Sequence, residues 1–271
     1  MCQASLAAYA DLVDFGLVSA ASTMVPCAWF PATAAFCRDN AQRVDMGVHT
    51  TLTSEWDGYR WGPISTRDPV SGLLDGEGYF YRSEEEAQEF GQPEAVQREI
   101  EAQVERALAE GIDVTHVDTH MGTVFHPQFL GSYVGTALSH GLPPFLLRKS
   151  RAELQEMGVD AESAAMFEEM LRTFEAQGVP LLDEICMLPL DQPEDRATQV
   201  KGFLETLPAG ITYMLIHPAQ DGPELRAITP DWPSRVADYE AFSSEEVRGT
   251  FRSAGIQVLG WRALRDLMRA G

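Results

Sequence analysis

Short apolar, β-branched runs alternate along this chain with longer segments of helical periodicity, and this alternation restricts the fold more than any other feature. Strands are predicted over residues 17–25, 44–52, 114–118, 144–148, 181–187, 211–216 and 256–259. Helices are predicted over residues 3–15, 31–40, 93–110, 151–177, 194–207 and 243–254, and from Pro127 towards Gly141. Such alternation is typical of a parallel sheet with helices outside it. We expect a single α/β domain over residues 1–271, closed or nearly closed into a barrel, with functional side chains at the carboxyl ends of the strands.

The segment between residues 53 and 92 interrupts this pattern. It is rich in Gly, Pro and Asp and carries several aromatic residues, Trp56, Tyr59 and Trp61 among them. A connection of this length without clear periodicity is usually functional. We interpret it as an insertion or lid whose aromatic rings either stack on a ligand or cover the mouth of the barrel.

Charge and composition exclude several classes of partner. The chain has 20 Lys+Arg against 41 Asp+Glu, a net charge of −21, which would repel nucleic acids and anionic membranes. No segment approaches the roughly 20 consecutive apolar residues that span a bilayer. No basic segment precedes an apolar run at the N-terminus, so we expect no signal peptide and a cytoplasmic protein. The four cysteines have no metal-binding spacing and are expected to be reduced.

Four of the six histidines stand at or just after predicted strands. His49 follows Gly47 in MGVHTTLT, His116 and His120 flank Asp118 in THVDTH, and His217 closes ITYMLIHP. A single strand histidine is more often a buried structural residue than a ligand. Several at strand ends of one parallel domain favour a metal site, because two imidazoles and a carboxylate leave positions open for water and substrate. Residues spaced by two share one face of a strand, so the THVDTH side chains are expected to lie together.

These motifs resemble those of the YdjC-like carbohydrate deacetylases, the ChbG/HpnK group. The segments GLVSAASTMV, DMGVHTTLTSEW, THVDTHMGTVFHP, LIHP and FRSAGIQVLGWRAL occur in the family's order and cover essentially the whole chain. The resemblance implies a distorted (β/α) barrel. It also implies one divalent metal ion, Mg²⁺ or Zn²⁺, and the removal of acetyl groups from N-acetylated sugars.

The resemblance also assigns expected roles to individual residues. His49 and His120 match the metal ligands, and His217 matches a position for a general acid or an oxyanion partner. Asp118 is expected to orient an imidazole, with direct ligation as the lesser option. Arg148 closes the predicted strand 144–148, where it either steers substrate or is a surface charge, and Trp56 and Trp61 are candidates for stacking on a sugar ring.

One expected part of the family pattern has no counterpart in these residues. Members begin with a strand ending in an Asp-Asp-Phe-Gly-like motif, in which one aspartate completes the metal site and the other acts as base. Here MCQASL matches the residues that follow that motif, and Asp11 and Asp14 fall within or at the end of the predicted first helix. We consider three explanations: a start site assigned too far downstream, a shortened chain, or a pseudoenzyme. A missing strand leaves backbone groups of its neighbours unpaired, which favours the first.

The function expected from the resemblance is therefore hydrolysis of the acetamido group of an amino sugar, with weak metal binding and little activity in the chain as it stands. Two alternatives stay open. One is a catalytically inactive sugar-binding barrel. The other is a metallo-hydrolase of different specificity such as a phosphoesterase, which the lack of a basic cluster near the histidines disfavours. The metal, the sugar and the oligomeric state, a homo-oligomer included, are left open by the sequence.

Overall fold

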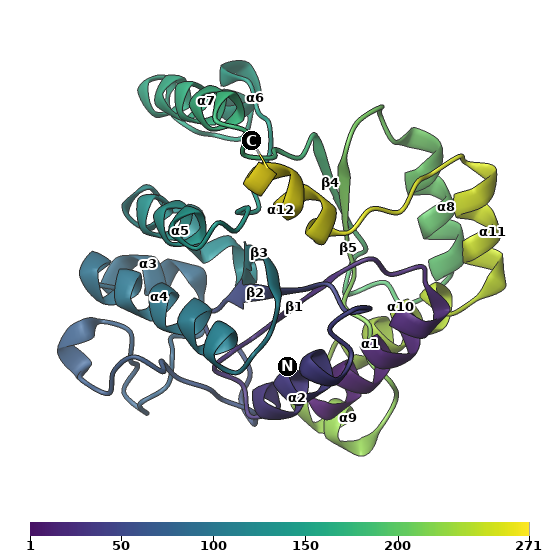
Figure 1. Cartoon of the computed structure of the whole chain (residues 1–271). Coiled ribbons are helices and arrows are strands. Elements are labelled where there is room, and N and C mark those ends of the chain that lie inside the picture. The colour runs from purple at the N-terminus through teal and green to yellow at the C-terminus, as the bar shows by residue number, and fades with distance from the viewer. Residues whose placement is uncertain (271) are drawn as a thin grey trace.

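Five parallel strands form the centre of the molecule in the computed structural model, which describes residues 1–270 (Figure 1). One sheet has the order β1-β2-β3 and a second pairs β4 with β5. The strands are β1 (Ala21–Thr23), β2 (Met46–Thr50), β3 (Val114–Thr119), β4 (Glu184–Met187) and β5 (Thr212–Leu215). All three pairings are parallel, as the alternation of strands and helices predicts.

The two sheets are connected by a segment that pairs only at single residues. Val117 bridges to Pro144, and Leu147 bridges to Leu182, both in the parallel sense. Prolines at positions 143 and 144 lack backbone N–H groups and cannot sustain a continuous ladder, so the strand predicted over 144–148 is reduced to isolated bridges. The strand predicted over 256–259 is irregular. Among residues 1–270 no pairing joins β5 to β1, so the predicted distorted barrel is not confirmed, whereas the parallel α/β domain is.

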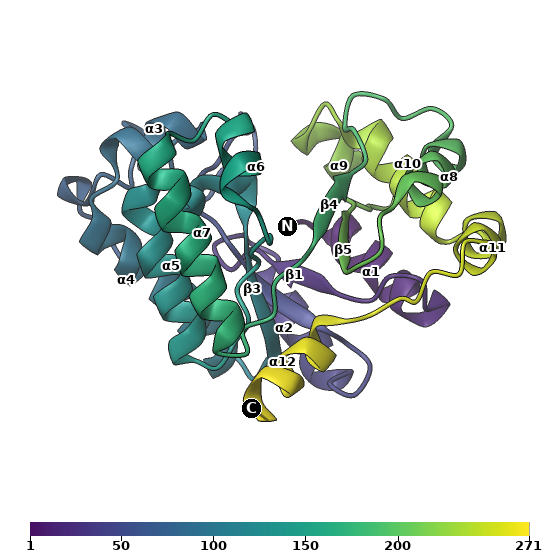
Figure 2. The same ribbon diagram turned by 90° about the horizontal axis from the view of Figure 1, so that it is seen from above.

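Helices surround the strands on both sides. In Figures 1 and 2, α3 to α7 lie on one side of the strands, and α8, α10 and α11 lie on the other. The helices are α1 (Gln3–Phe15), α2 (Phe30–Asp39), α3 (Glu84–Phe90), α4 (Pro93–Ala109), α5 (Pro127–Ser139), α6 (Arg151–Glu156), α7 (Ala161–Ala176), α8 (Arg196–Thr206), α9 (Pro223–Ile228), α10 (Trp232–Phe242), α11 (Glu245–Ser253) and α12 (Trp261–Ala270), with short 3₁₀ helices η1 (Pro69–Ser71) and η2 (His120–Phe125).

Helix α4 illustrates how the sequence pattern becomes packing. Pro93 begins the helix at a position where a missing N–H costs nothing, and Val96, Ile100 and Val104 are buried against the sheet. Leu108 continues the spacing of four but is exposed, because a 3.6-residue repeat drifts away from that spacing and turns Ala107 inward instead.

Two features of the helices differ from the prediction. The expected helix 151–177 is divided into α6 and α7, because Gly158 adopts φ = 92° and Asp160 starts a new helix by accepting hydrogen bonds from Glu162 and Ser163. Helices α3, α9, α10 and α12 were not predicted.

The four cysteines are free and buried. Within residues 1–270 no helix is both long enough and apolar enough to cross a membrane.

Candidate active site

Four of the histidine-motif residues gather at the carboxyl ends of the parallel strands. His49 lies near the end of β2, directly opposite Asp118 of β3 in the sheet register. His120 is the first residue of η2 and follows β3 immediately. The His49 and His120 rings lie with their centroids 5.4 Å apart. His217 follows β5 by two residues.

Asp118 holds the His49 imidazole in one orientation. Its Oδ1 lies 2.8 Å from His49 Nδ1, while its Oδ2 accepts hydrogen bonds from the hydroxyls of Ser22 at 2.8 Å and Tyr213 at 3.1 Å. Burial would raise the pKa of Asp118, but the electrostatic interaction with His49 and these hydrogen bonds outweigh it and lower the pKa to about 2. An ionised carboxylate only accepts hydrogen bonds, so Nδ1 of His49 carries the proton and Nε2 keeps its lone pair.

His116 lies behind this pair and is completely buried. Its ring stacks on Trp261 of α12, with a centroid distance of 4.7 Å and an interplanar angle of 10°. A Cβ at residue 47 would come within 2.5 Å of the ring, so only glycine at this position leaves room for the His116 side chain. Trp261 also contacts Tyr213 edge-on at 6.1 Å, and α12 thereby packs against two residues that surround Asp118. In this arrangement His116 packs α12 against the strand that carries Asp118.

Glu55 is a site residue that the sequence patterns did not single out. Its Oε2 lies 3.0 Å from Nε2 of His120. Burial would raise the pKa of Glu55, but the hydrogen bond and the electrostatic interaction with His120 hold it below its usual value. The only sequence signal is its place in TLTSEW, six residues after His49, and a lone acidic residue in a loop-rich segment gives no reason to select it.

His217 is held by its backbone and has a depressed pKa. Its N–H donates to Oδ2 of Asp238 at 2.9 Å, and Asp238 also pairs with the buried Arg196. Burial, and then the charge of Arg235, lower the pKa of His217 to about 3, so its ring is neutral at ordinary pH. Its Nδ1 is buried and has no hydrogen-bond partner within residues 1–270.

The three expected substrate-binding residues lie in different surroundings. Trp61 is 4% exposed, packs edge-on against His120 at 6.3 Å, and donates its indole N–H to the Thr53 carbonyl. Trp56 is 9% exposed and contacts Trp61 at 5.5 Å, with the Arg235 guanidinium over its ring. Arg148 is half exposed and forms ion pairs with Glu175 and Asp183.

His49 and His120 each have one ring nitrogen free to bind a divalent ion. His49 Nε2 and His120 Nδ1 form no hydrogen bond within residues 1–270, and imidazole nitrogens are common metal ligands. Asp11 instead accepts hydrogen bonds from Gln220 and Tyr239, and Asp14 pairs with Arg43, so neither joins the histidines. In the part of the chain that the structure describes, no three His, Cys, Asp or Glu side chains are arranged to hold a metal ion.

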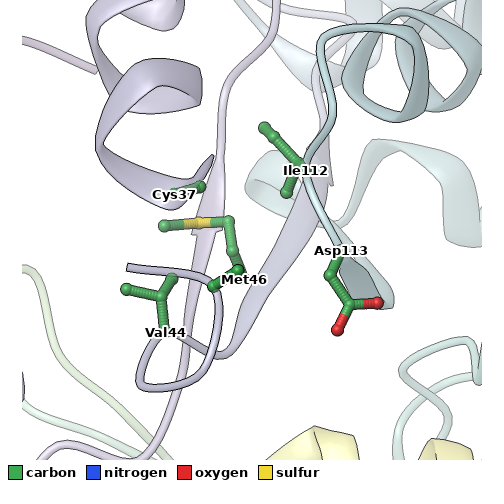
Figure 3. Close-up of a pocket in the computed structure, with 6 residues that line it drawn as sticks. Cys37, Val44, Met46, Ile112 and Asp113 are labelled. Carbon is green, nitrogen blue, oxygen red and sulfur yellow. The ribbon is translucent and has the colours of Figure 1, made fainter. Parts of the chain in front are cut away.

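A small apolar crevice lies at the opposite ends of the strands. Figure 3 shows Cys37, Val44, Met46 and Ile112 around it, with Asp113 at its edge. Met46 begins β2, and Asp113 precedes β3 by one residue and pairs with arginines of α12. This crevice is a packing feature at the amino ends of the strands, opposite the ends that carry His49, His120 and His217.

The fold and the site together define an α/β protein with paired histidines and carboxylates at the carboxyl ends of its parallel strands. The chain belongs to the YdjC-like protein family, which it matches over residues 1–253. It is 34% identical over 250 residues to a carbohydrate deacetylase of Thermus thermophilus, covering 91% of this chain and 84% of that protein. A carbohydrate deacetylase of Thermoanaerobacter pseudethanolicus is 22% identical over 220 residues, covering 81% and 78%.

A solved structure shares the fold. It is a protein of Enterococcus faecalis named for cellobiose-phosphate cleavage, and it superposes with a TM-score of 0.78 at 20% identity over 97% of this chain and 94% of that one. At this identity the likeness concerns the fold, and it extends over nearly the whole of both chains.

Proposed function

We propose that this protein is a carbohydrate deacetylase that hydrolyses the acetamido group of an N-acetylated amino sugar, with a divalent ion, Mg²⁺ or Zn²⁺, held by His49 and His120. The names of the relatives favour this reaction over phosphoester hydrolysis. The observation that carries the proposal is the 5.4 Å approach of the two rings, each hydrogen-bonded to its own carboxylate.

Each residue has a distinct part in the proposed reaction. Asp118 keeps the proton of His49 on Nδ1 and leaves Nε2 free to bind an ion. A divalent ion there would supply Lewis acidity towards the amide carbonyl. His217 is neutral, so its N–H suits it to stabilise an oxyanion better than to act as general acid. The buried Trp61 contributes a rigid wall beside His120, and Trp56 packs against Trp61. Arg148 is assigned to the rim, where a sugar hydroxyl would compete with its two ion pairs.

The decisive assay measures acetate released from N-acetylglucosamine oligomers with and without a chelator. We expect His49→Ala and His120→Ala to abolish release, as the chelator does. His140→Ala is the matched control, because His140 only ends helix α5 and should leave release unchanged. Release that survives both His49→Ala and the chelator would contradict the proposal.

A second candidate is a sugar-binding protein without catalysis. It is favoured by one observation, the absence of a third metal-ligating side chain beside the two histidines within residues 1–270. This candidate predicts calorimetric binding of N-acetylglucosamine oligomers with no acetate release at any metal concentration. The same calorimetry and acetate assay therefore separate the two functions.

A further inference from the structure

Glu55 and His120 reproduce the relation between Asp118 and His49. In both pairs a carboxylate oxygen lies within 3.0 Å of one imidazole nitrogen, and both carboxylates are largely buried. Asp118 contacts Nδ1 of its partner, whereas Glu55 contacts Nε2. The nitrogens left without a hydrogen bond are therefore Nε2 of His49 and Nδ1 of His120.

The loop that carries Glu55 is anchored on both sides of the carboxylate. Ser54 donates its backbone N–H to Tyr81 and accepts from the N–H of Trp61, whose indole N–H in turn donates to Thr53. The Trp61 ring packs edge-on against His120. A side chain on so well fixed a backbone can keep an imidazole in one orientation at little further entropic cost.

We propose that Glu55 is a positioning residue for His120, holding the proton on Nε2 so that Nδ1 is the nitrogen offered to a metal ion. The inference deepens the proposed function and rests on it for the identity of the bound ion. It follows from the contact geometry, since a carboxylate accepts and does not donate. Outer carboxylates of this kind orient the imidazole and raise its basicity as a ligand.

Two other roles for Glu55 make different predictions. As a metal ligand it would have to leave Nε2 of His120, and as a general base it would need its negative charge. Glu55→Gln separates these roles from positioning, because the amide oxygen still accepts a hydrogen bond but carries no charge. Glu55→Ala removes the acceptor altogether. Asp57→Ala is the matched control, because Asp57 lies in the same loop but is fully exposed and pairs only with Arg82 at the surface.

The test is the tautomer of His120, observed by ¹H–¹⁵N NMR on full-length protein freed of metal by a chelator, with the signals assigned by their loss in His120→Gln. Wild type, Glu55→Gln and Asp57→Ala should have the proton on Nε2. Glu55→Ala should lose that preference. Calorimetric titration with Zn²⁺ should show a loss of affinity of about 10–100-fold in Glu55→Ala and a much smaller loss in Glu55→Gln.

Two results would overturn the inference. One is a His120 tautomer in Glu55→Ala that equals that of wild type. The other is a Glu55→Gln variant that keeps the tautomer but loses Zn²⁺ affinity as completely as Glu55→Ala, which would make Glu55 a ligand. The tautomer measurement needs neither metal nor substrate. If acetate release fails in the wild type while the tautomers behave as expected, the proposed function fails and the positioning role stands.

Discussion

Replacing Gly47 by alanine should destabilise the protein through a single steric conflict. An added Cβ would lie 2.5 Å from two atoms of the His116 ring and 2.7 Å from a third. Ordinary contacts between such atoms are about 3.5–4.0 Å, so the ring would have to retreat by roughly 1 Å. It cannot do so freely, because it is fully buried and stacked on Trp261.

The expected cost can be worked out from two opposing terms. Overpacking of a well-packed interior costs about 1–3 kcal/mol, and the stacked ring places this site near the upper end. Alanine regains up to about 1 kcal/mol over glycine in a regular element, since it has less backbone freedom to lose. The net change in the free energy of unfolding should therefore be a loss of about 2 kcal/mol.

Guanidinium denaturation of wild type, Gly47→Ala, His116→Ala and the double variant measures this cost. Removing the ring makes room for the new methyl group and cancels the whole steric cost, so the double variant should be less destabilised than the sum of the singles by about 3 kcal/mol. Gly135→Ala is the control, because Gly135 is in α5 with nothing within 4 Å of an added Cβ, and it should gain about 0.5–1 kcal/mol. A Gly47→Ala variant as stable as wild type, or strictly additive single changes, would refute the steric explanation.

Three further outcomes are expected. Asp118→Asn should lower Zn²⁺ affinity by about 10–100-fold in a calorimetric titration, because an amide has a single acceptor oxygen and cannot accept both from His49 and from the hydroxyls of Ser22 and Tyr213, and unchanged affinity would remove Asp118 from the site. Since the pKa of His217 is lowered to about 3, the unfolded chain binds a proton there below about pH 6.5 that the folded chain does not, and stability falls as pH decreases. His217→Gln should therefore reduce the pH dependence of the free energy of unfolding by about 1.4 kcal/mol per pH unit between roughly pH 4 and pH 6, and equal slopes would show that the folded ring titrates normally. Trp261→Ala should cost about 3–5 kcal/mol in denaturation, because a buried indole leaves a cavity beside His116 and Tyr213, and a cost below 1 kcal/mol would mean that α12 is not firmly docked.

Local patterns were sufficient for the elements with strong periodicity or clear end signals. Helix α1 runs over the predicted residues and ends at Gly16 with φ = 79°, and α4 begins at Pro93 as expected. Strands β2 and β3 lie within or beside the predicted ranges because their β-branched residues are buried on both faces. The division between α6 and α7 and the irregular segment 256–259 depended on local turn geometry and on tertiary packing, which periodicity does not report.

The positions of the motifs in the sequence also predicted part of the contact between neighbouring strands. His49 and the THVDTH motif end neighbouring parallel strands, and parallel register then brings His49 opposite Asp118. No spacing rule connects Glu55 to His120 or Tyr213 to Asp118, because those contacts join residues 65 and 95 positions apart through loops and separate sheets.

The sequence by itself thus determined the parallel α/β class, the family, and the histidines at the strand ends, since each of these depends on short-range patterns of residue type. Only the tertiary structure decided which carboxylate holds which imidazole, that Trp56 and Trp61 are buried, and that the two sheets are joined by single bridges. The physical reason is the distance along the chain over which each kind of interaction acts. Periodicity and motif spacing record the preferences of neighbouring residues, whereas tautomers, pKa shifts and buried contacts are set by groups that only the packed chain brings together.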